Sequence, residues 1–307
     1  MADAYRIGVI GARGHAGSEL LHILDRHPDV EVVLAGSREL SGRPVPEIDG
    51  LTFESLGPEA VAERDLDALF LALPDGVGGP WSAAVPDGTV IVDISADHRF
   101  DDDWVYGLPE LNRDKIAGAR RIANPGCYAT ALQLTIAPFL EDLHGVPSVF
   151  GVSGYSGAGT TPSPRNDPDN LKDNLIPYKL TGHNHEREGT HHLGQTVRFM
   201  PHVHPAFRGL LVTTHMPLAE PMAVEEASAR LTASYASEPL VDVQEDIPNL
   251  RDGTELIGVL IGGVTVSEDG LGLIVVAAED NLLKGAAVQA AQNMNLALGL
   301  PETEGIL

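Results

Sequence analysis

The sequence is poorest in cysteine, because Cys127 is the only one among 307 residues. A single cysteine cannot form a disulfide within the chain, and a lone thiol is a poor basis for a metal site. No run of 18 or more apolar residues is present, so the sequence offers no candidate for a membrane-spanning helix. The first five residues lack the basic and apolar character of a secretory leader. These absences predict a cytoplasmic protein.

Basic residues are also scarce, with 20 Lys and Arg against 44 Asp and Glu and a net charge of −24. Such a surface repels polyanions, which argues against nucleic acid and anionic membranes as partners.

The apolar content of 43% is sufficient for one large domain or two smaller ones. In the first part, apolar runs at 6–10, 30–35, 66–73 and 89–94 alternate with helical stretches, which predicts a parallel sheet. Behind it, the runs 149–154, 209–215, 255–266 and 271–278 and a helix at 224–235 predict an antiparallel α+β portion. The character of the sequence changes near Cys127.

A glycine turn follows the first strand, in the segment Gly11-Ala12-Arg13-Gly14-His15-Ala16-Gly17. Strand, glycine turn and amphipathic helix together predict a dinucleotide site, although the spacing is G-x-x-G-x-x-G. Gly11 would allow the tight turn, and Gly14 the close approach of a pyrophosphate to the helix N-terminus. The alternative is an ordinary strand–helix turn.

Ser37 and Arg38 end the second strand, where an NAD-preferring site usually places an acidic residue for the ribose hydroxyls. A hydroxyl and a guanidinium suit a 2′-phosphate instead, which predicts NADP(H). The alternative is that Arg38 is a solvated surface residue.

Cys127 stands between Pro125-Gly126 and a helical stretch, 129–137, that Pro138 should end. This predicts a thiol at a helix N-terminus, where unpaired N–H groups favour an anion. Such positions lower a cysteine pKa from about 8.5 to roughly 3.5–7.5 and supply a nucleophilic thiolate. A buried structural cysteine is the alternative.

His183 and His185, with Glu188 three residues on, allow three interpretations. They could bind a transition metal from one face of a strand, or they could be solvated and have no role. They could also be acid–base partners of Cys127, with Glu188 orienting a ring or binding substrate. A nicotinamide cofactor, a thiolate and a histidine together indicate acyl–aldehyde chemistry through a thioester. The polar stretch 161–174 before them is typical of a flexible loop or lid.

Six motifs, in order along the chain, resemble the N-acetyl-γ-glutamyl-phosphate reductases, of the aspartate-semialdehyde dehydrogenase superfamily. They are Gly11–Gly17, Asp93-Ile94-Ser95-Ala96-Asp97, Tyr106–Glu110, Asn124-Pro125-Gly126-Cys127-Tyr128, Gly151–Gly159 and Asp280–Ala286. The resemblance implies a Rossmann-type NADP-binding domain, 1–126 completed by 280–307, and an α+β catalytic and dimerisation domain of mostly antiparallel sheet, 127–279. It also implies a homodimer or homotetramer.

The resemblance further implies that Cys127 attacks N-acetyl-γ-glutamyl phosphate and releases inorganic phosphate, before NADPH reduces the thioester to the semialdehyde in arginine biosynthesis. His185 would be the base, with His183 and Glu188 beside the thiol. The expected cofactor-binding residues are Gly11, Arg13, Gly14, His15, Ala16, Gly17, Ser37, Arg38, Pro74, Ser95, Gly157 and Asn281, the last at the nicotinamide carboxamide. The expected substrate-binding residues are Arg99, Asn124, Tyr155, Ser156 and Arg208.

One departure from the family pattern is Arg187, where the family usually has proline before the glutamate, and it puts the local backbone in question. Two alternatives to the expected activity stay open at this point. One is a reductase of a related acyl phosphate, aspartyl or aminoadipyl in type. The other is a dinucleotide-binding redox sensor that does not catalyse a reaction.

Overall fold

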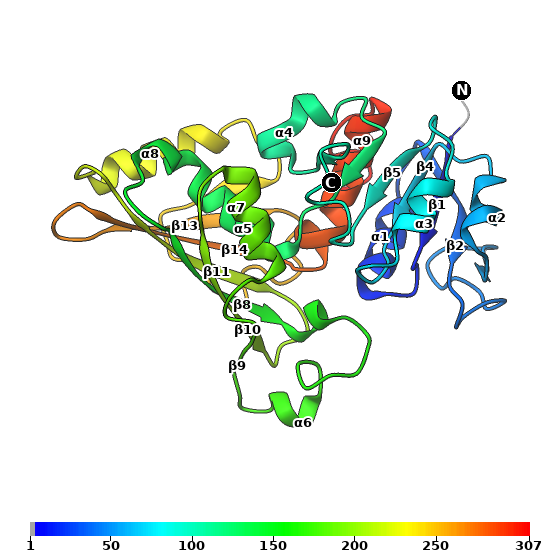
Figure 1. Ribbon diagram of the computed structural model, residues 1–307, viewed down its shortest axis with the longest axis horizontal. Helices are drawn as coiled ribbons and strands as arrows, with labels where there is room; N and C mark the ends of the chain where they lie inside the picture. The colour runs from blue at the N-terminus through cyan, green and yellow to red at the C-terminus, as the bar shows by residue number, and fades with distance from the viewer. Residues whose placement is uncertain (1–3) are drawn as a thin grey trace. The chain divides into compact units, whose positions relative to one another are not determined.

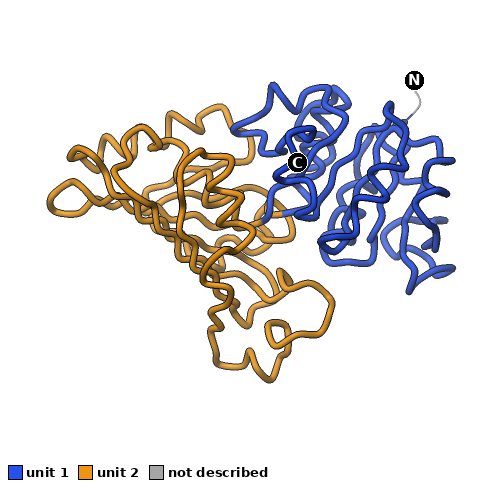
Figure 2. Tube along the Cα trace, in the orientation of Figure 1, with its two compact units in different colours: residues 1–126, 286–307 blue, residues 127–285 orange. Residues whose placement is uncertain are grey.

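The computed structural model describes residues 4–307, which form two compact units (Figure 2). Unit 1 contains the chain up to Gly126 together with Ala286–Leu307, and unit 2 is Cys127–Gly285. Unit 2 is therefore an insertion between two segments of unit 1.

Unit 1 is built on a seven-stranded parallel sheet with the strand order β3-β2-β1-β4-β5-β7-β6 (Figure 1). The strands are β1 Tyr5–Ile10, β2 Val30–Gly36, β3 Phe53–Glu54, β4 Ala68–Leu71, β5 Val90–Asp93, β6 Val105–Tyr106 and β7 Arg121–Ala123; the helices are α1 His15–Asp25, α2 Pro58–Ala62, α3 Gly79–Ala84, α4 Pro109–Ile116 and α9 Val288–Leu298. The central strands β4 and β5 are buried along their whole length, as expected of a parallel sheet covered on both faces. This confirms the predicted front sheet.

The C-terminal helix α9 belongs to unit 1, where it contacts α1, α4 and β5. Its Asn293 donates to the carbonyl of Gly107 at 2.9 Å and to Asn124 at 2.9 Å, and Asn295 bonds to His27 at 3.0 Å. The chain returns to unit 1 at Ala286, later than the predicted 280. The reason is that Asn281 hydrogen bonds within unit 2.

Unit 2 has a second seven-stranded sheet, with the order β12-β13-β14-β11-β8-β10-β9. Its strands are β8 Ser148–Gly154, β9 Ile176–Pro177, β10 Arg198–His204, β11 Leu210–Pro217, β12 Val241–Val243, β13 Val259–Val266 and β14 Gly272–Glu279; its α-helices are α5 Cys127–Ile136, α6 Pro168–Leu171, α7 Asn184–Leu193 and α8 Val224–Tyr235. Only the β8–β10 and β12–β13 pairs are parallel. The mostly antiparallel character is as predicted.

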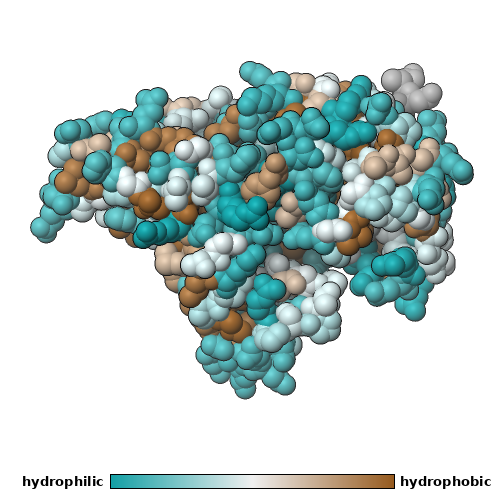
Figure 3. Space-filling view, viewed as in Figure 1, coloured by the Kyte–Doolittle hydropathy of each residue, from teal (hydrophilic) through white to brown (hydrophobic). Residues whose placement is uncertain are grey.

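Helices α5, α7 and α8 cover one face of this sheet (Figure 1). On the other face, Phe150 of β8 is 39% exposed, and its ring lies tilted against that of His202 of β10, with ring centroids 4.3 Å apart. In Figure 3 hydrophobic side chains show among hydrophilic ones over this unit. Unit 2 therefore leaves part of its sheet without a covering layer.

The helix α5 is buried at every residue after Cys127. It packs on β11, β14 and α7, and the Thr135 and Thr214 hydroxyls meet at 2.7 Å inside the unit. A helix that is buried on all sides is enclosed by its neighbours, and here the polar side chains of Thr130, Gln133 and Thr135 are buried with the apolar ones. It begins two residues before the predicted start, and Pro138 lies in a 3₁₀ turn that follows it, so the position of Cys127 is fixed by core packing.

Candidate active site

Cys127 is the first residue of α5 and is partly accessible. The backbone N–H groups of the first helical turn favour negative charge on its sulfur. A Cβ on Gly285 would lie 2.7 Å from the Cβ of Cys127 and 3.0 Å from Oε1 of Glu279. Position 285 therefore requires glycine, which places no side chain between the Cys127 thiol and the buried carboxyl group of Glu279.

The histidine segment is a helix, so the metal-binding alternative, which would need both histidines on one face of a strand, does not have that geometry. His183 is the N-cap of α7, and its Nδ1 accepts a hydrogen bond from the backbone N–H of His185 at 3.1 Å. Burial, helped by Lys179 and Arg165, lowers the pKa of His183 to about 4. His183 is therefore neutral at physiological pH and supports the helix that carries His185.

The ring of His185 lies close to the rings of His183 and Tyr128, at centroid distances of 4.8 and 5.7 Å. Tyr128 follows Cys127 in the chain and donates its hydroxyl to the carbonyl of His202 at 2.8 Å. Burial and the negative charge of Cys127 raise the pKa of Tyr178, whose ring is 5.5 Å from that of His183. Unit 2 thus gathers the thiol and both histidines around two tyrosines.

Glu188 is wholly buried in α7, one turn beyond His185 and on the same side of the helix. Its neighbour Glu186, which the sequence analysis did not single out, accepts hydrogen bonds from the backbone of Gly182 at 2.7 Å and Phe199 at 3.0 Å. Arg187 is exposed, so its departure from the family pattern leaves both carboxylates in place. Within residues 4–307 no three His, Cys, Asp or Glu side chains are grouped as metal ligands.

Arg208 of unit 2 is mostly buried, and its Nε lies 3.4 Å from the Asp280 carboxylate. Burial raises the pKa of Asp280, against hydrogen bonds from Leu282 and Glu255 that lower it. Arg208 is thus a nearly buried cation in an acidic chain. This suits the predicted contact with an anionic substrate.

Ser156 and Asn281 are joined, because the Asn281 amide donates to the Ser156 hydroxyl at 2.8 Å and accepts from the N–H of Gly209 at 3.0 Å. Gly157 is the next residue, and a Cβ there would be 3.8 Å from the Asn281 amide nitrogen. Tyr155 instead packs edge-on against Phe207, at 5.4 Å between centroids. The predicted roles of these residues toward cofactor and substrate stay predictions.

In unit 1 the glycine turn has the form that a pyrophosphate requires. Gly11 has φ +84°, and a Cβ there would lie 2.1 Å from the carbonyl oxygen of Ala72. A Cβ on Gly17 would lie 2.5 Å from the carbonyl of Gly11. Helix α1 begins at His15 with Gly14 as N-cap, without a capping side chain or an acidic residue in its first turn. The residues present therefore fit the phosphates of a dinucleotide.

At the end of β2, the buried Ser37 hydroxyl accepts from the N–H of Leu40 at 3.3 Å. Arg38 is exposed, and Arg13 pairs with Glu39 at 2.7 Å on the surface. Pro74 is exposed in the turn after β4. These placements are compatible with the predicted cofactor contacts, which stay predictions.

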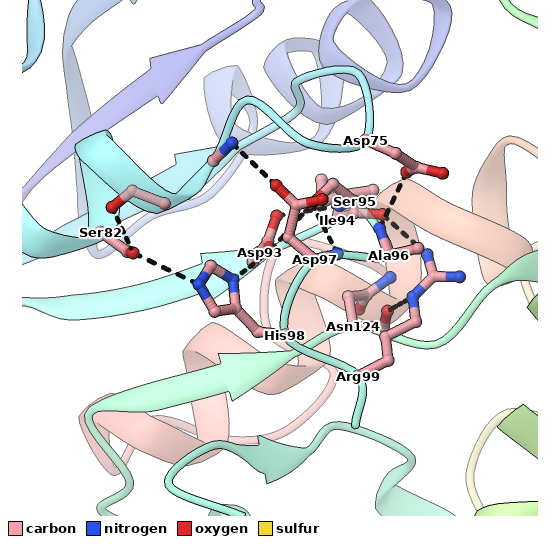
Figure 4. A network of polar contacts seen from close by, with 12 residues as sticks. Asp75, Ser82, Asp93, Ile94, Ser95, Ala96, Asp97, His98, Arg99 and Asn124 are labelled. Atoms are coloured by element: carbon pink, nitrogen blue, oxygen red, sulfur yellow. Dashed lines mark hydrogen bonds and ion pairs between the residues drawn. The ribbon is translucent and has the colours of Figure 1, made fainter. Parts of the chain in front are cut away.

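The turns after β4 and β5 are tied together by a network that the sequence analysis missed (Figure 4). Asp97 accepts from the N–H of Gly78 at 2.8 Å, and buried Asp93 accepts from Ser95 Oγ at 2.9 Å and from His98 Nδ1 at 2.6 Å. The His98 ring also stacks on Trp104 at 3.8 Å. The acidic residues of the Asp-x-Ser-x-Asp motif were its only signal in the sequence. The network fixes Ser95 at the sheet's carboxyl edge.

Arg99 and Asn124, both predicted to bind substrate, are buried in unit 1. Arg99 donates to the carbonyls of Asn124 and Ile94, each at 2.9 Å, and the Asn124 side chain bonds to Asn293 and to the carbonyl of Ala286. These contacts favour a structural role for both residues. They hold the segment that leads to Cys127.

Comparison with known proteins identifies the family. Residues 6–119 match the family model "Semialdehyde dehydrogenase, NAD binding domain", and residues 127–281 match "Semialdehyde dehydrogenase, dimerisation domain". A protein of Xanthomonas oryzae pv. oryzae named N-acetyl-gamma-glutamyl-phosphate reductase is 51% identical over 308 residues, 98% of each chain. Proteins of that name from Stenotrophomonas maltophilia and Xylella fastidiosa are 48% and 47% identical, over 99% and 98% of this chain and 98% and 95% of their own.

The chain belongs to the N-acetyl-γ-glutamyl-phosphate reductase family. Solved structures agree on the fold. Aspartate semialdehyde dehydrogenase II of Vibrio cholerae is 20% identical with TM-score 0.80, covering 97% of this chain and 99% of its own. The Candida albicans aspartate semialdehyde dehydrogenase with NADP is 18% identical with TM-score 0.73, covering 97% and 99%. The predicted family, fold class and enzyme class, an oxidoreductase with a nicotinamide cofactor, are confirmed.

Proposed function

We propose that the chain reduces N-acetyl-L-glutamyl 5-phosphate to N-acetyl-L-glutamate 5-semialdehyde with NADPH, releasing inorganic phosphate, as a step of arginine biosynthesis. The observation that carries this proposal is the placement of Cys127 at the start of α5, with His185 held beside Tyr128, in a chain of this family. The relatives' shared name supplies the substrate.

The chemistry follows from the residues of unit 2. The Cys127 thiolate attacks the acyl carbon, the C–O bond to phosphate breaks, and a thioester remains on the sulfur. NADPH supplies the hydride when bound, and the sulfur then departs as thiolate. His185 accepts the thiol proton before attack and returns a proton as the products form. His183 holds the α7 N-terminus and stays neutral, and Arg208 binds the anionic substrate.

The reverse reaction tests this proposal. Given N-acetylglutamate semialdehyde, NADP and phosphate, the protein should produce NADPH, followed by its absorbance, and arsenate or phosphate should be required. Activity with aspartate semialdehyde or an aminoadipate-derived semialdehyde instead would keep the mechanism and change the substrate. No reduction of NADP with any of these would favour the redox sensor.

Arg38→Asp is expected to weaken NADPH binding by about 10- to 100-fold and NADH binding far less, because only NADPH has a 2′-phosphate. Kd values for both cofactors, measured by fluorescence, check this expectation. Arg120→Asp is the control for net charge, because Arg120 is an exposed arginine of the same unit that directly precedes β7. Equal weakening of both cofactors would remove Arg38 from the 2′-phosphate site.

We also propose the division of work between the units: unit 1 binds NADPH, and unit 2 supplies the nucleophile and the contact between subunits. The partly uncovered sheet face around Phe150 supports a homodimer or homotetramer, as does the match of unit 2 to a dimerisation domain. A sedimentation mass of 32.5 kDa, that of one chain, would contradict it.

A cytoplasmic site of action suits a catalytic thiolate, because a thiolate needs reducing conditions. Cell fractionation would check this location. No helix in the described residues is long and apolar enough to cross a membrane.

A further inference from the structure

Arg165 belongs to the loop of unit 2 that leads from β8 to α6 (Figure 1). Its guanidinium carbon lies over the ring of Tyr178, 4.9 Å from the centroid, which is a cation–π contact. The Tyr178 ring is 5.5 Å from the ring of His183, and that ring is 4.8 Å from the ring of His185. Arg165 is thus linked to the proposed base through two aromatic side chains.

Tyr178 also connects Arg165 electrostatically to the thiol. Burial raises the pKa of the Tyr178 hydroxyl, the negative charge of Cys127 raises it further, and the positive charge of Arg165 opposes both. After burial and Lys179, the charge of Arg165 also lowers the pKa of His183. Arg165 and the thiolate therefore lie within electrostatic range of the same tyrosine hydroxyl.

The loop that carries Arg165 is held by the side chain of Asn166. The Asn166 amide donates to the carbonyls of Gly159 and Thr161, at 2.9 and 2.8 Å. Its oxygen accepts from the N–H of Ser163 at 2.7 Å. The backbone that leads to Arg165 therefore has a defined path, and the position of the guanidinium does not depend on a ligand.

The positive charge of Arg165 is not neutralised by a carboxylate. In the described part of the chain its guanidinium forms no ion pair, although acidic residues outnumber basic ones 44 to 20. By contrast, the Nε of Arg208 lies 3.4 Å from the Asp280 carboxylate, and Lys179 donates to Asn184 at 3.2 Å. Arg165 thus offers an unneutralised cation to a ligand at the active site.

The proposed substrate has two anionic groups, a carboxylate and a phosphate, and each is suited to a guanidinium. Arg208 can bind one of them. Arg99, which was expected to help, donates instead to the carbonyls of Asn124 and Ile94 in unit 1. One anionic group is therefore left for another cation of unit 2.

We propose that Arg165 is a substrate-binding residue, whose guanidinium, held over the ring of Tyr178, binds an oxyanion of the acyl phosphate, its carboxylate or its phosphoryl group. The inference rests on the proposed function for the identity of the substrate. A guanidinium presents five N–H donors in a fork that matches both kinds of oxyanion, so part of it can contact Tyr178 while the rest binds the ligand.

The charge that Arg165 places near the thiol can be measured without turnover, because Cys127 is the only cysteine. Anionic iodoacetate and neutral iodoacetamide alkylate the same sulfur, so the ratio of their rates reports the local potential and cancels changes in thiol reactivity. Arg165→Gln should lower this ratio about 3- to 10-fold at low ionic strength, and Arg165→Lys should keep most of it. Arg198→Gln removes an exposed arginine at the start of β10 and should leave the ratio unchanged. An equal ratio in Arg165→Gln and the wild type would overturn the assignment.

Protection of the thiol identifies the oxyanion. Inorganic phosphate and N-acetylglutamate, which supply the phosphate and the carboxylate separately, should each slow alkylation by iodoacetamide. Arg165→Gln should raise the half-protecting concentration about tenfold for at least one of them, and this result names the group that Arg165 binds. Unchanged protection by both, or no protection of the wild type by either, would overturn the inference. These measurements use neither cofactor nor acyl phosphate, so failure of this inference and failure of the proposed reaction are distinguishable.

Discussion

Replacing Cys127 by serine is expected to lower kcat by about 10⁴-fold or more, the scale on which loss of a covalent nucleophile acts. A serine hydroxyl is hardly ionised at neutral pH, so the N–H groups at the start of α5 have no thiolate to stabilise. NADPH binding should persist, because the glycine turn belongs to unit 1. Initial rates and cofactor fluorescence give the two readouts.

The single thiol makes a clean control possible. One equivalent of an alkylating agent should label Cys127 alone, and loss of activity should follow the fraction labelled. Acyl phosphate added first should protect the thiol. Normal turnover in Cys127→Ser would remove the thioester from the mechanism, and full activity after labelling would do the same.

Replacing His185 by asparagine is expected to lower kcat by about 10²–10⁴-fold, the usual contribution of a general acid–base. His183→Asn should cost no more than about tenfold, because asparagine can still cap α7 and receive the N–H of residue 185. His183→Ala, which removes the helix cap, should lower kcat more than His183→Asn does. Single-turnover rates of both thiol attack and hydride transfer would locate the loss.

The structural role of His183 has a signature in stability against pH. Its pKa is about 4 in the folded chain and 6.5 ordinarily, so between these values the unfolded chain binds more protons. Its contribution is thus present above pH 6.5 and falls by up to about 1.4 kcal/mol for each pH unit between pH 6.5 and about 4, with no further loss below that. His183→Asn should flatten this part of the profile. In the kinetic comparison above, a larger loss of kcat in His183→Asn than in His185→Asn would reverse the roles assigned to the two histidines.

The sheet of unit 1 could be predicted because β1, β2, β4 and β5 are continuous apolar runs that a parallel sheet buries on both faces. The strands β3 and β6 are only two residues long, too short to show a period. Helix α7 was missed for another reason: its sequence NHEREGTHHL has almost no apolar face, and it is held by the His183 cap and by Glu186. Those contacts exist only in the folded unit.

At the site, the position of Cys127 at the start of a helix was predictable because proline, glycine and an apolar helix leave a strong local signal. The substrate-binding roles predicted for Arg99 and Asn124 stay predictions, and the buried hydrogen bonds by which they position the approach to Cys127 could not be seen in the sequence. Whether a residue binds a ligand or holds the backbone depends on its burial and on its hydrogen-bond partners, and both depend on tertiary structure.

The tight contact between Gly285 and Cys127 has a topological consequence. Cys127 is the first residue of the inserted unit and Gly285 is the last, so the two ends of the segment 127–285 meet at Cys127. A substitution that forces the two ends apart would displace Cys127, the proposed nucleophile, directly. The closure of the insertion and the placement of the thiol are one and the same feature of the backbone.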